Sequence, residues 1–117
     1  IYQLKQAKSL QAIADELSVK LNREVQLIGD ENKPVRTIAW CTGAAQGYID
    51  QAIAANIDVF VSGEISEQTV HQVRESNTAY ISAGHHATER YGIKALGEHL
   101  AGKFDLQQEF VDINNPV

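Results

Sequence analysis

The chain has 117 residues, of which 44% are apolar and 21% are charged, and its formal net charge is -5. This profile is typical of one soluble globular domain that buries about two-thirds of its surface, and it excludes a disordered chain. The acidic balance and the scattering of the ten Lys and Arg residues exclude a nucleic-acid surface built on phosphate contacts, which needs clustered cations.

The apolar runs, residues 57–61 and 38–41, are far shorter than the roughly 20 residues that cross a bilayer, so we expect no membrane contact. No signal-peptide pattern opens the chain. The single cysteine, Cys41, has no internal disulfide partner, which favours a reducing, cytoplasmic location. Because Cys41 lies in a strand-like run, we expect a buried, inert thiol rather than a nucleophile.

The chain contains no Met and begins with Ile1, although translation starts at Met. We therefore expect a single α/β domain over residues 1–117 that is the C-terminal portion of a longer polypeptide. Within it, residues 1–33 form a helix and a short strand that lead into residues 34–117.

The first element expected is an amphipathic helix over residues 4–21. Its apolar face needs a partner and consists of Leu10, Ile13, Ala14, Leu17 and Leu21. Ser9 is the expected N-cap if the helix starts late.

Strand and helix patterns alternate along the rest of the chain. The expected elements are strand 24–28, turn 29–34, strand 35–41, helix 46–55, strand 58–62, helix 66–75, strand 78–83, helix 87–101 and strand 107–111. This alternation implies crossover connections, so we expect an α/β layered sandwich with a mostly parallel sheet flanked by helices. Ligand sites in such sheets lie beyond the carboxyl ends of the strands. Loops 42–47, 63–65 and 84–86 leave those ends.

Two of these loops allow two interpretations each. The glycine-bearing loop 42–47 allows backbone N–H groups to approach an anion, or merely permits a tight turn, and it lacks the Lys and the glycine spacing of a P-loop. Glu64 directly follows a strand, where it suits a general base or a residue that holds a metal-bound water. Alternatively, Glu64 is an acidic residue stabilised by the dipole of the next helix, for which Ser66 is the N-cap.

The third loop leads into the densest group of chemically active side chains, residues 82–90. His85 and Glu89 are four residues apart, which places them on one face of a helix. Imidazole nitrogen and carboxylate oxygen are ligands that zinc, manganese and iron accept, although a surface helix also carries this spacing for solvation alone. Two ligands do not complete a site, because a zinc ion takes three or four from protein.

Four segments together resemble a known family. They are Trp-Cys-Thr-Gly at 40–43, Ser-Gly-Glu-Ile-Ser-Glu-Gln-Thr at 62–69, Gly-His-His-Ala-Thr-Glu-Arg at 84–90 and Asp-Ile-Asn-Asn-Pro at 112–116. From about residue 35 to its end, the chain is similar to the C-terminal half of the bacterial Nif-three-like family. These dinuclear metal centre proteins are also named GTP cyclohydrolase 1 type 2 homologs.

The resemblance implies toroidal homohexamers with two divalent metal ions per full-length subunit. It implies that His85 and Glu89 are metal ligands, and that a His pair and an Asp come from an N-terminal half that this chain does not contain. We expect a catalytic, water-positioning or ligand-supporting role for Glu64. We expect substrate contacts for His86, beside the ligand, and for Arg90, which suits an anionic substrate group.

The resulting expectation is a metal-dependent hydrolase that acts on a small substrate, with nucleotide-like compounds among the candidates. The alternative is a non-catalytic, ring-shaped protein that binds metal or a partner, and whose ions hold structure or sense metal supply. Histidine and carboxylate ligands suit zinc, iron and manganese alike, so the sequence does not select the metal.

Overall fold

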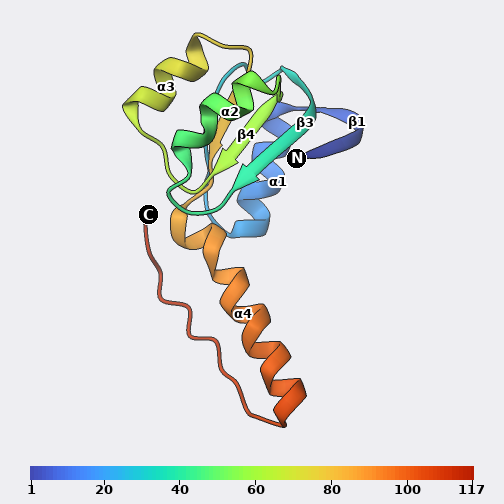
Figure 1. Ribbon diagram of the computed structural model, residues 1–117, viewed down its shortest axis with the longest axis vertical. Helices are drawn as coiled ribbons and strands as arrows, with labels where there is room; N and C mark the ends of the chain where they lie inside the picture. Colours follow the sequence, from blue (N-terminus) through green and yellow to red (C-terminus); the bar gives the residue numbers. More distant parts are fainter.

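The computed structural model describes residues 1–117 and shows a five-stranded sheet with helices on both faces and one long projecting helix (Figure 1). The elements are β1 (Tyr2–Ser9), α1 (Leu10–Leu21), β2 (Gln26–Ile28), β3 (Pro34–Cys41), η1 (Gln46–Tyr48), α2 (Ile49–Ala54), β4 (Val59–Ser62), α3 (Glu67–Arg74), β5 (Ala79–Ser82) and α4 (His85–Phe104). The expected α/β sandwich is confirmed. No helix combines the length and the apolar character that crossing a membrane requires.

The sheet is parallel at its centre and antiparallel at both edges. Its strand order is β1-β3-β4-β5-β2, and β3, β4 and β5 run parallel to one another, whereas β1 pairs antiparallel with β3 and β2 antiparallel with β5. The expected parallel arrangement therefore holds for the three strands whose loops were predicted to form a site. The carboxyl ends of these three strands lie together at one end of the sheet, next to the start of α4 (Figure 1).

Two apolar clusters cover the two faces of the sheet. Alternate side chains of a strand point to opposite faces, so Val59 and Val61 pack with the buried face of α1 while Phe60 packs against α2 and α3. Phe60 meets the ring of Tyr80 edge-on, with 5.7 Å between ring centroids. The sheet is therefore buried on both faces at β4 and β5.

The first helix begins later than its sequence pattern suggested. Residues 2–9 form β1, which pairs with β3, and only Leu10–Leu21 is helical. The physical reason is that the apolar helical period begins at Leu10, and that the Ser9 side chain accepts a hydrogen bond from the backbone N–H of Ala12 (3.2 Å). Ser9 is thus the N-cap of a late-starting helix, as the sequence allowed.

Two further expectations are wrong, and a third is refined. Residues 107–111 form no strand. They belong to a C-terminal segment, residues 105–117, called the tail below, which returns along α4 and meets no strand edge because α4 leads away from the sheet (Figure 1). Cys41 is exposed rather than buried, because the β1–β3 pairing ends at Tyr2 and Ile38 and leaves the end of β3 uncovered. The helix expected over 46–55 starts with a short 3-10 turn, η1.

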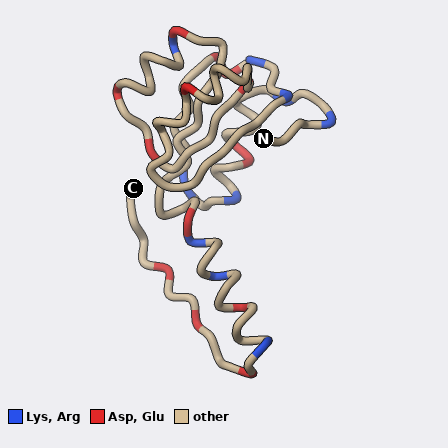
Figure 2. Tube along the Cα trace, viewed as in Figure 1, with Lys and Arg blue, Asp and Glu red and all other residues tan.

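The charged residues are interspersed over the trace. Figure 2 shows Lys and Arg interspersed with Asp and Glu on the body and along α4, without a continuous basic band. This distribution agrees with the scattering of Lys and Arg along the sequence.

Candidate functional site

The three loops that leave β3, β4 and β5 are joined by backbone hydrogen bonds. The N–H of Gly63 donates to the carbonyl of Gly43 (3.0 Å), and the N–H of Gly84 donates to the carbonyl of Gly63 (2.9 Å). The N–H of Ala83 also donates to the carbonyl of Ser62 (2.7 Å). Together these bonds continue the pairing of the strands into the loops. This stack holds the start of α4 against the ends of the two neighbouring strands.

His85 and Glu89 lie side by side in the first turns of α4, as their spacing predicted. His85 Nε2 is 3.1 Å from Glu89 Oε2, and His85 Nδ1 is 2.5 Å from Oε1 of Glu64, which comes from the β4–α3 loop. The imidazole is about one-third exposed and lies between two carboxylates. The structure therefore brings together all three residues that the sequence suggested for metal binding and its support.

The electrostatics of this group are dominated by the two carboxylates. The hydrogen bond with Glu64 raises the pKa of His85 above its ordinary value, against a smaller effect of desolvation, and the negative charges of Glu89 and Glu64 raise it further. A carboxylate on one ring nitrogen is the usual support of a metal-binding histidine, because it fixes the ring and leaves the other nitrogen to coordinate. Glu64 holds Nδ1 in this way, while Nε2 faces Glu89.

Glu64 is itself held from the core. Its backbone carbonyl accepts a hydrogen bond of 2.6 Å from the hydroxyl of Tyr80, whose side chain is fully buried. Ser66 is the N-cap of α3, as expected, because its hydroxyl accepts from the N–H of Thr69. No sequence pattern indicates this role of Tyr80 beyond its place in a strand.

The backbone of loop 42–47 is used inside the chain. The N–H of Gly43 donates to the hydroxyl of Thr88 (3.3 Å), and the N–H of Ala45 donates to the carbonyl of Gly43 (2.9 Å). These bonds favour the tight-turn interpretation of this loop over the anion-binding one, since both N–H groups already have acceptors.

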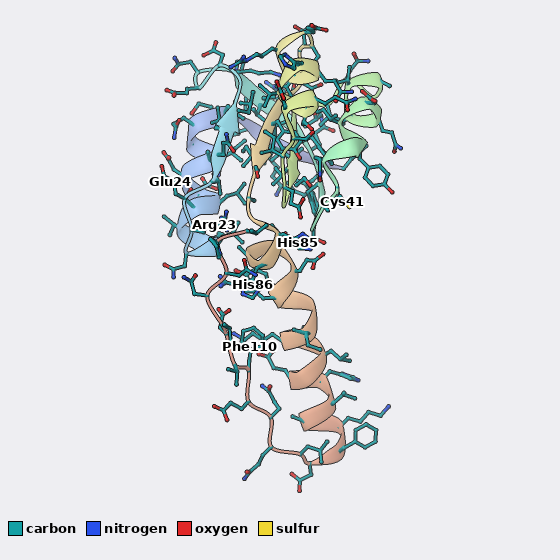
Figure 3. All side chains as sticks on the ribbon, turned by 90° about the vertical axis from the view of Figure 1, so that its left-hand side faces the viewer. Arg23, Glu24, Cys41, His85, His86 and Phe110 are labelled. Carbon is teal, nitrogen blue, oxygen red and sulfur yellow. The ribbon has the colours of Figure 1, made fainter.

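His86 and Arg90 contact the tail rather than the His85–Glu89 pair. His86 Nε2 is 2.8 Å from Oδ1 of Asp112, Arg90 Nη1 donates to Oδ2 of the same carboxylate (2.9 Å), and Arg90 Nη2 donates to the carbonyl of Leu21 (2.7 Å). The bond with His86 lowers the pKa of Asp112 against desolvation, and Arg90 lowers it further. Figure 3 shows His86 at the root of α4 and Phe110 on the tail that runs beside the helix. Asp112 begins the Asp-Ile-Asn-Asn-Pro segment at 112–116, and no pattern in the sequence indicates its contacts with His86 and Arg90.

No group of three or more His, Cys, Asp or Glu side chains in the chain is arranged to hold a metal ion. The chain offers two coordinating side chains, His85 and Glu89, with Glu64 occupied as the support of His85. A complete site in this position requires ligands from outside residues 1–117.

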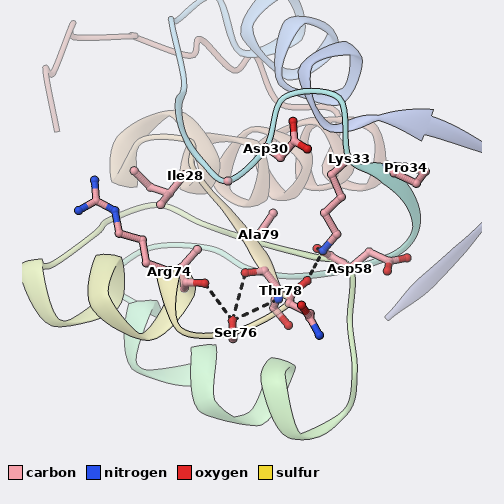
Figure 4. Close-up of a pocket in the computed structure, with 12 residues that line it drawn as sticks. Ile28, Asp30, Lys33, Pro34, Asp58, Arg74, Ser76, Thr78 and Ala79 are labelled. Carbon is pink, nitrogen blue, oxygen red and sulfur yellow. Dashed lines mark hydrogen bonds between the residues drawn. The ribbon is translucent and has the colours of Figure 1, made fainter.

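Two of the cavities bear on the use of the sheet's two ends. One of about 300 Å³ is mostly apolar and lies between α1 and the ends of β3 and β4; it reaches Thr88, next to Glu89, but none of His85, Glu89 and Glu64 lines it. The other, of about 550 Å³, lies at the opposite ends of the strands (Figure 4). There the Lys33 ammonium donates to the carbonyls of Asp58 and Asn77, so its charge is already used to tie the turn before β3 to the starts of β4 and β5.

Comparison with known proteins gives a consistent family assignment. The family described as Duf34/NIF3 (NGG1p interacting factor 3) matches residues 1–116. A Pseudomonas aeruginosa protein named GTP cyclohydrolase 1 type 2 homolog is 57% identical over 97 residues, which are 83% of this chain and 38% of that protein. A Haemophilus influenzae protein of the same name is 50% identical over 117 residues, covering 98% of this chain and 46% of that protein.

The solved structures agree with this assignment. The structure of protein ybgI, described as of unknown function, matches with a TM-score of 0.92 and 42% identity, and covers 98% of this chain and 47% of that one. The chain thus spans less than half the length of the curated relatives and of the solved structure described here.

Proposed function

This chain belongs to the Duf34/NIF3 family, and we propose that the full-length protein that contains it is a metal-dependent hydrolase with a dinuclear metal centre. The observation that carries the proposal is the imidazole of His85, which lies between Glu89 at Nε2 and Glu64 at Nδ1. The name GTP cyclohydrolase 1 type 2 homolog, which the relatives bear, supports hydrolysis of a small, nucleotide-like substrate.

The residues present suit part of such a centre. His85 would contribute Nε2 and Glu89 a carboxylate oxygen, while Glu64 fixes the ring of His85 through Nδ1. Zinc, iron and manganese all accept this donor set. A pair of such ions, when bound, supplies a water of lowered pKa and polarises a carbonyl, imine or phosphoryl oxygen. The remaining ligands would come from the half of the protein outside this chain.

The surroundings of the site support a small substrate. The apolar cavity of about 300 Å³, which reaches Thr88, the residue before Glu89, is at the lower end of the range for small-molecule sites. An anionic substrate group would reach His86 and Arg90 by replacing the carboxylate of Asp112, which now bridges them. In this proposal His86 and Arg90 contact the substrate once Asp112 is displaced, and Glu64 positions water or supports His85.

The exposed surface of α4 supports self-association, and we include a homohexamer, located in the cytoplasm, in the proposal. Only Ala87 of this 20-residue helix is buried. Its exposed apolar side chains are Tyr91, Ile93, Leu96, Leu100 and Phe104. An apolar surface of this kind typically meets another protein surface. The same observation favours the second candidate function, a non-catalytic ring-shaped protein whose ions hold the assembly together.

Activity measurements on the full-length, metal-loaded protein separate the two functions. A panel of nucleotides and cyclic compounds is tested with the wild type, with His85→Ala and Glu89→Gln, and with the matched controls His99→Ala and Glu98→Gln on the exposed part of the same helix. Hydrolysis that is lost in the first pair, kept in the controls and accompanied by an unchanged oligomer supports the enzyme. A wild type that is inactive across the panel and dissociates on chelation supports the non-catalytic candidate instead.

A further inference from the structure

Gly43, two residues beyond the carboxyl end of β3, has its open Cβ position facing both members of the candidate metal pair. Its φ of +69° lies in the left-handed region that favours glycine. A Cβ built at this position would lie 2.3 Å from Oε1 of Glu89 and 3.3 Å from Nε2 of His85. The carboxylate of Glu89 therefore occupies the space that any side chain at position 43 would take.

The backbone of Gly43 is fixed from two sides. Its carbonyl accepts hydrogen bonds from the N–H of Gly63 (3.0 Å) and from the hydroxyl of Ser62 (3.2 Å), which is fully buried. Its N–H donates to the hydroxyl of Thr88, the neighbour of Glu89 in α4. The loop is tied to β4 and α4, so it has little room to withdraw from a new contact.

Close packing at Gly63 also limits movement of the loop that carries Gly43. A Cβ on Gly63 would lie 2.7 Å from the carbonyl oxygen of Gly43 and 2.8 Å from Cα of His85. The loops and the helix start thus meet at backbone contact distance. The Glu89 carboxylate, by contrast, is the free end of a flexible side chain that is 51% exposed. When space at position 43 is filled, the Glu89 carboxylate is the group that moves.

We propose that Gly43 is a positioning residue of the metal centre: the absence of a side chain at 43 sets where the Glu89 carboxylate lies relative to Nε2 of His85. This inference rests on the proposed function of that pair. Ala at position 43 leaves the loop bonded in place and displaces the carboxylate, so metal affinity falls while the fold is kept. Loss of a group that orients a metal ligand typically weakens binding about 10–100-fold.

The test uses the full-length protein and two metals. Zinc affinity is measured by competition with a chromogenic chelator, and the visible absorption spectrum of bound cobalt reports the ligand set. The variants are Gly43→Ala, Glu89→Asp, the double variant of these two, and the control Gly47→Ala, whose added Cβ would have no atom within 4 Å. Melting of the metal-free proteins, followed by circular dichroism, reports the fold.

Gly43→Ala is expected to bind zinc about 10–100-fold more weakly with an altered cobalt spectrum, and Gly47→Ala to match the wild type. The shorter Asp withdraws the carboxylate from the new Cβ, so the double variant is expected to bind more tightly than the product of the two single losses predicts. This coupling separates a steric effect on Glu89 from the backbone strain of Ala at a positive φ.

Three results would overturn the inference. They are wild-type affinity in Gly43→Ala, losses in the double variant that simply multiply, and a metal-free Gly43→Ala protein that fails to fold. In each case the proposed function stands as long as His85→Ala still abolishes zinc binding. A wild type that binds neither zinc nor cobalt contradicts the proposed function itself.

Discussion

Replacing Asp58 by Ala is expected to destabilise the fold, because one carboxylate oxygen joins the starts of two central strands. Oδ2 of Asp58 accepts hydrogen bonds from the backbone N–H groups of Arg36 and Thr37 (2.8 Å each) and from the Thr37 hydroxyl (3.0 Å). The Thr37 hydroxyl in turn accepts from the N–H of Asp58 (2.9 Å). The variant removes three acceptor contacts at once.

The magnitude follows from the number of bonds and their exposure. A hydrogen bond to a charged group contributes about 1.5–3 kcal/mol when buried. Here Arg36 is exposed and Asp58 half-buried, so water replaces part of each bond. Taking about 1 kcal/mol per bond gives a loss of about 2–3 kcal/mol, which corresponds to about 6–9 °C in Tm for a protein of the length of the relatives.

Thermal unfolding of the full-length protein tests this value. The control is Asp50→Ala, which removes a carboxylate that accepts only from the side chain of Gln72, in an exposed bond of 2.6 Å, and is expected to lower Tm by less than about 2 °C. If Asp58→Ala melts within about 2 °C of Asp50→Ala, the three-bond argument is refuted.

The same carboxylate gives the stability a defined pH dependence. Burial raises the pKa of Asp58, but the hydrogen bonds from Arg36 and Thr37 and the charge of Lys33 outweigh it and hold the pKa below its ordinary value. A carboxyl whose pKa is lowered on folding contributes stability that is complete above the unfolded pKa of about 3.9 and is lost as the pH falls through the folded value. The stability difference between wild type and Asp58→Asn is therefore constant at neutral pH and shrinks below about pH 4.

Three further variants probe the site and the tail. Glu64→Gln removes the charged support of His85 and is expected to weaken zinc binding about 10–100-fold in a chelator competition; an unchanged affinity would show that His85 is oriented by other contacts. Tyr80→Phe deletes a bond to the Glu64 carbonyl and is expected to cost about 1 kcal/mol in thermal melting, and a loss below about 0.3 kcal/mol would contradict that role. Asp112→Ala removes the tail's contacts with the His86 and Arg90 side chains and leaves the bond from the His86 N–H to the Val117 carbonyl, so amide hydrogen exchange in the tail is expected to accelerate, whereas wild-type protection would mean that the remaining contacts hold it.

The central part of the fold was predictable because its signals are local. Strand and helix patterns alternate from residue 35 onward, and the alternation of Val59, Phe60 and Val61 between two apolar clusters is what a sheet buried on both faces produces. The failures lie where tertiary context decides. Residues 2–9 are a strand only because β3 offers them an edge, and residues 107–111 are not, because α4 carries them away from any edge.

The candidate site was predictable in its residues but not in its contacts. Helical spacing alone placed His85 beside Glu89, and the parallel sheet placed Glu64 at the same edge. No local pattern indicates that the carboxylate of Asp112, more than 20 residues later in the chain, forms hydrogen bonds with the side chains of His86 and Arg90. Nor does the sequence indicate the space at Gly43, which depends on three loops packed at backbone distance.

A tilt of the long helix about its base would move its two ends by very different amounts. The helix is joined to the body by its first two turns, where Arg90 and Tyr91 donate to carbonyls at the end of α1. At 1.5 Å per residue its 20 residues span about 30 Å, so a tilt of about 5° at the base moves the tip by about 2.6 Å. The same tilt moves Glu89, about 6 Å from the base, by only about 0.5 Å, so the free end can adapt its position to a neighbouring surface while the chemistry at its root stays in register.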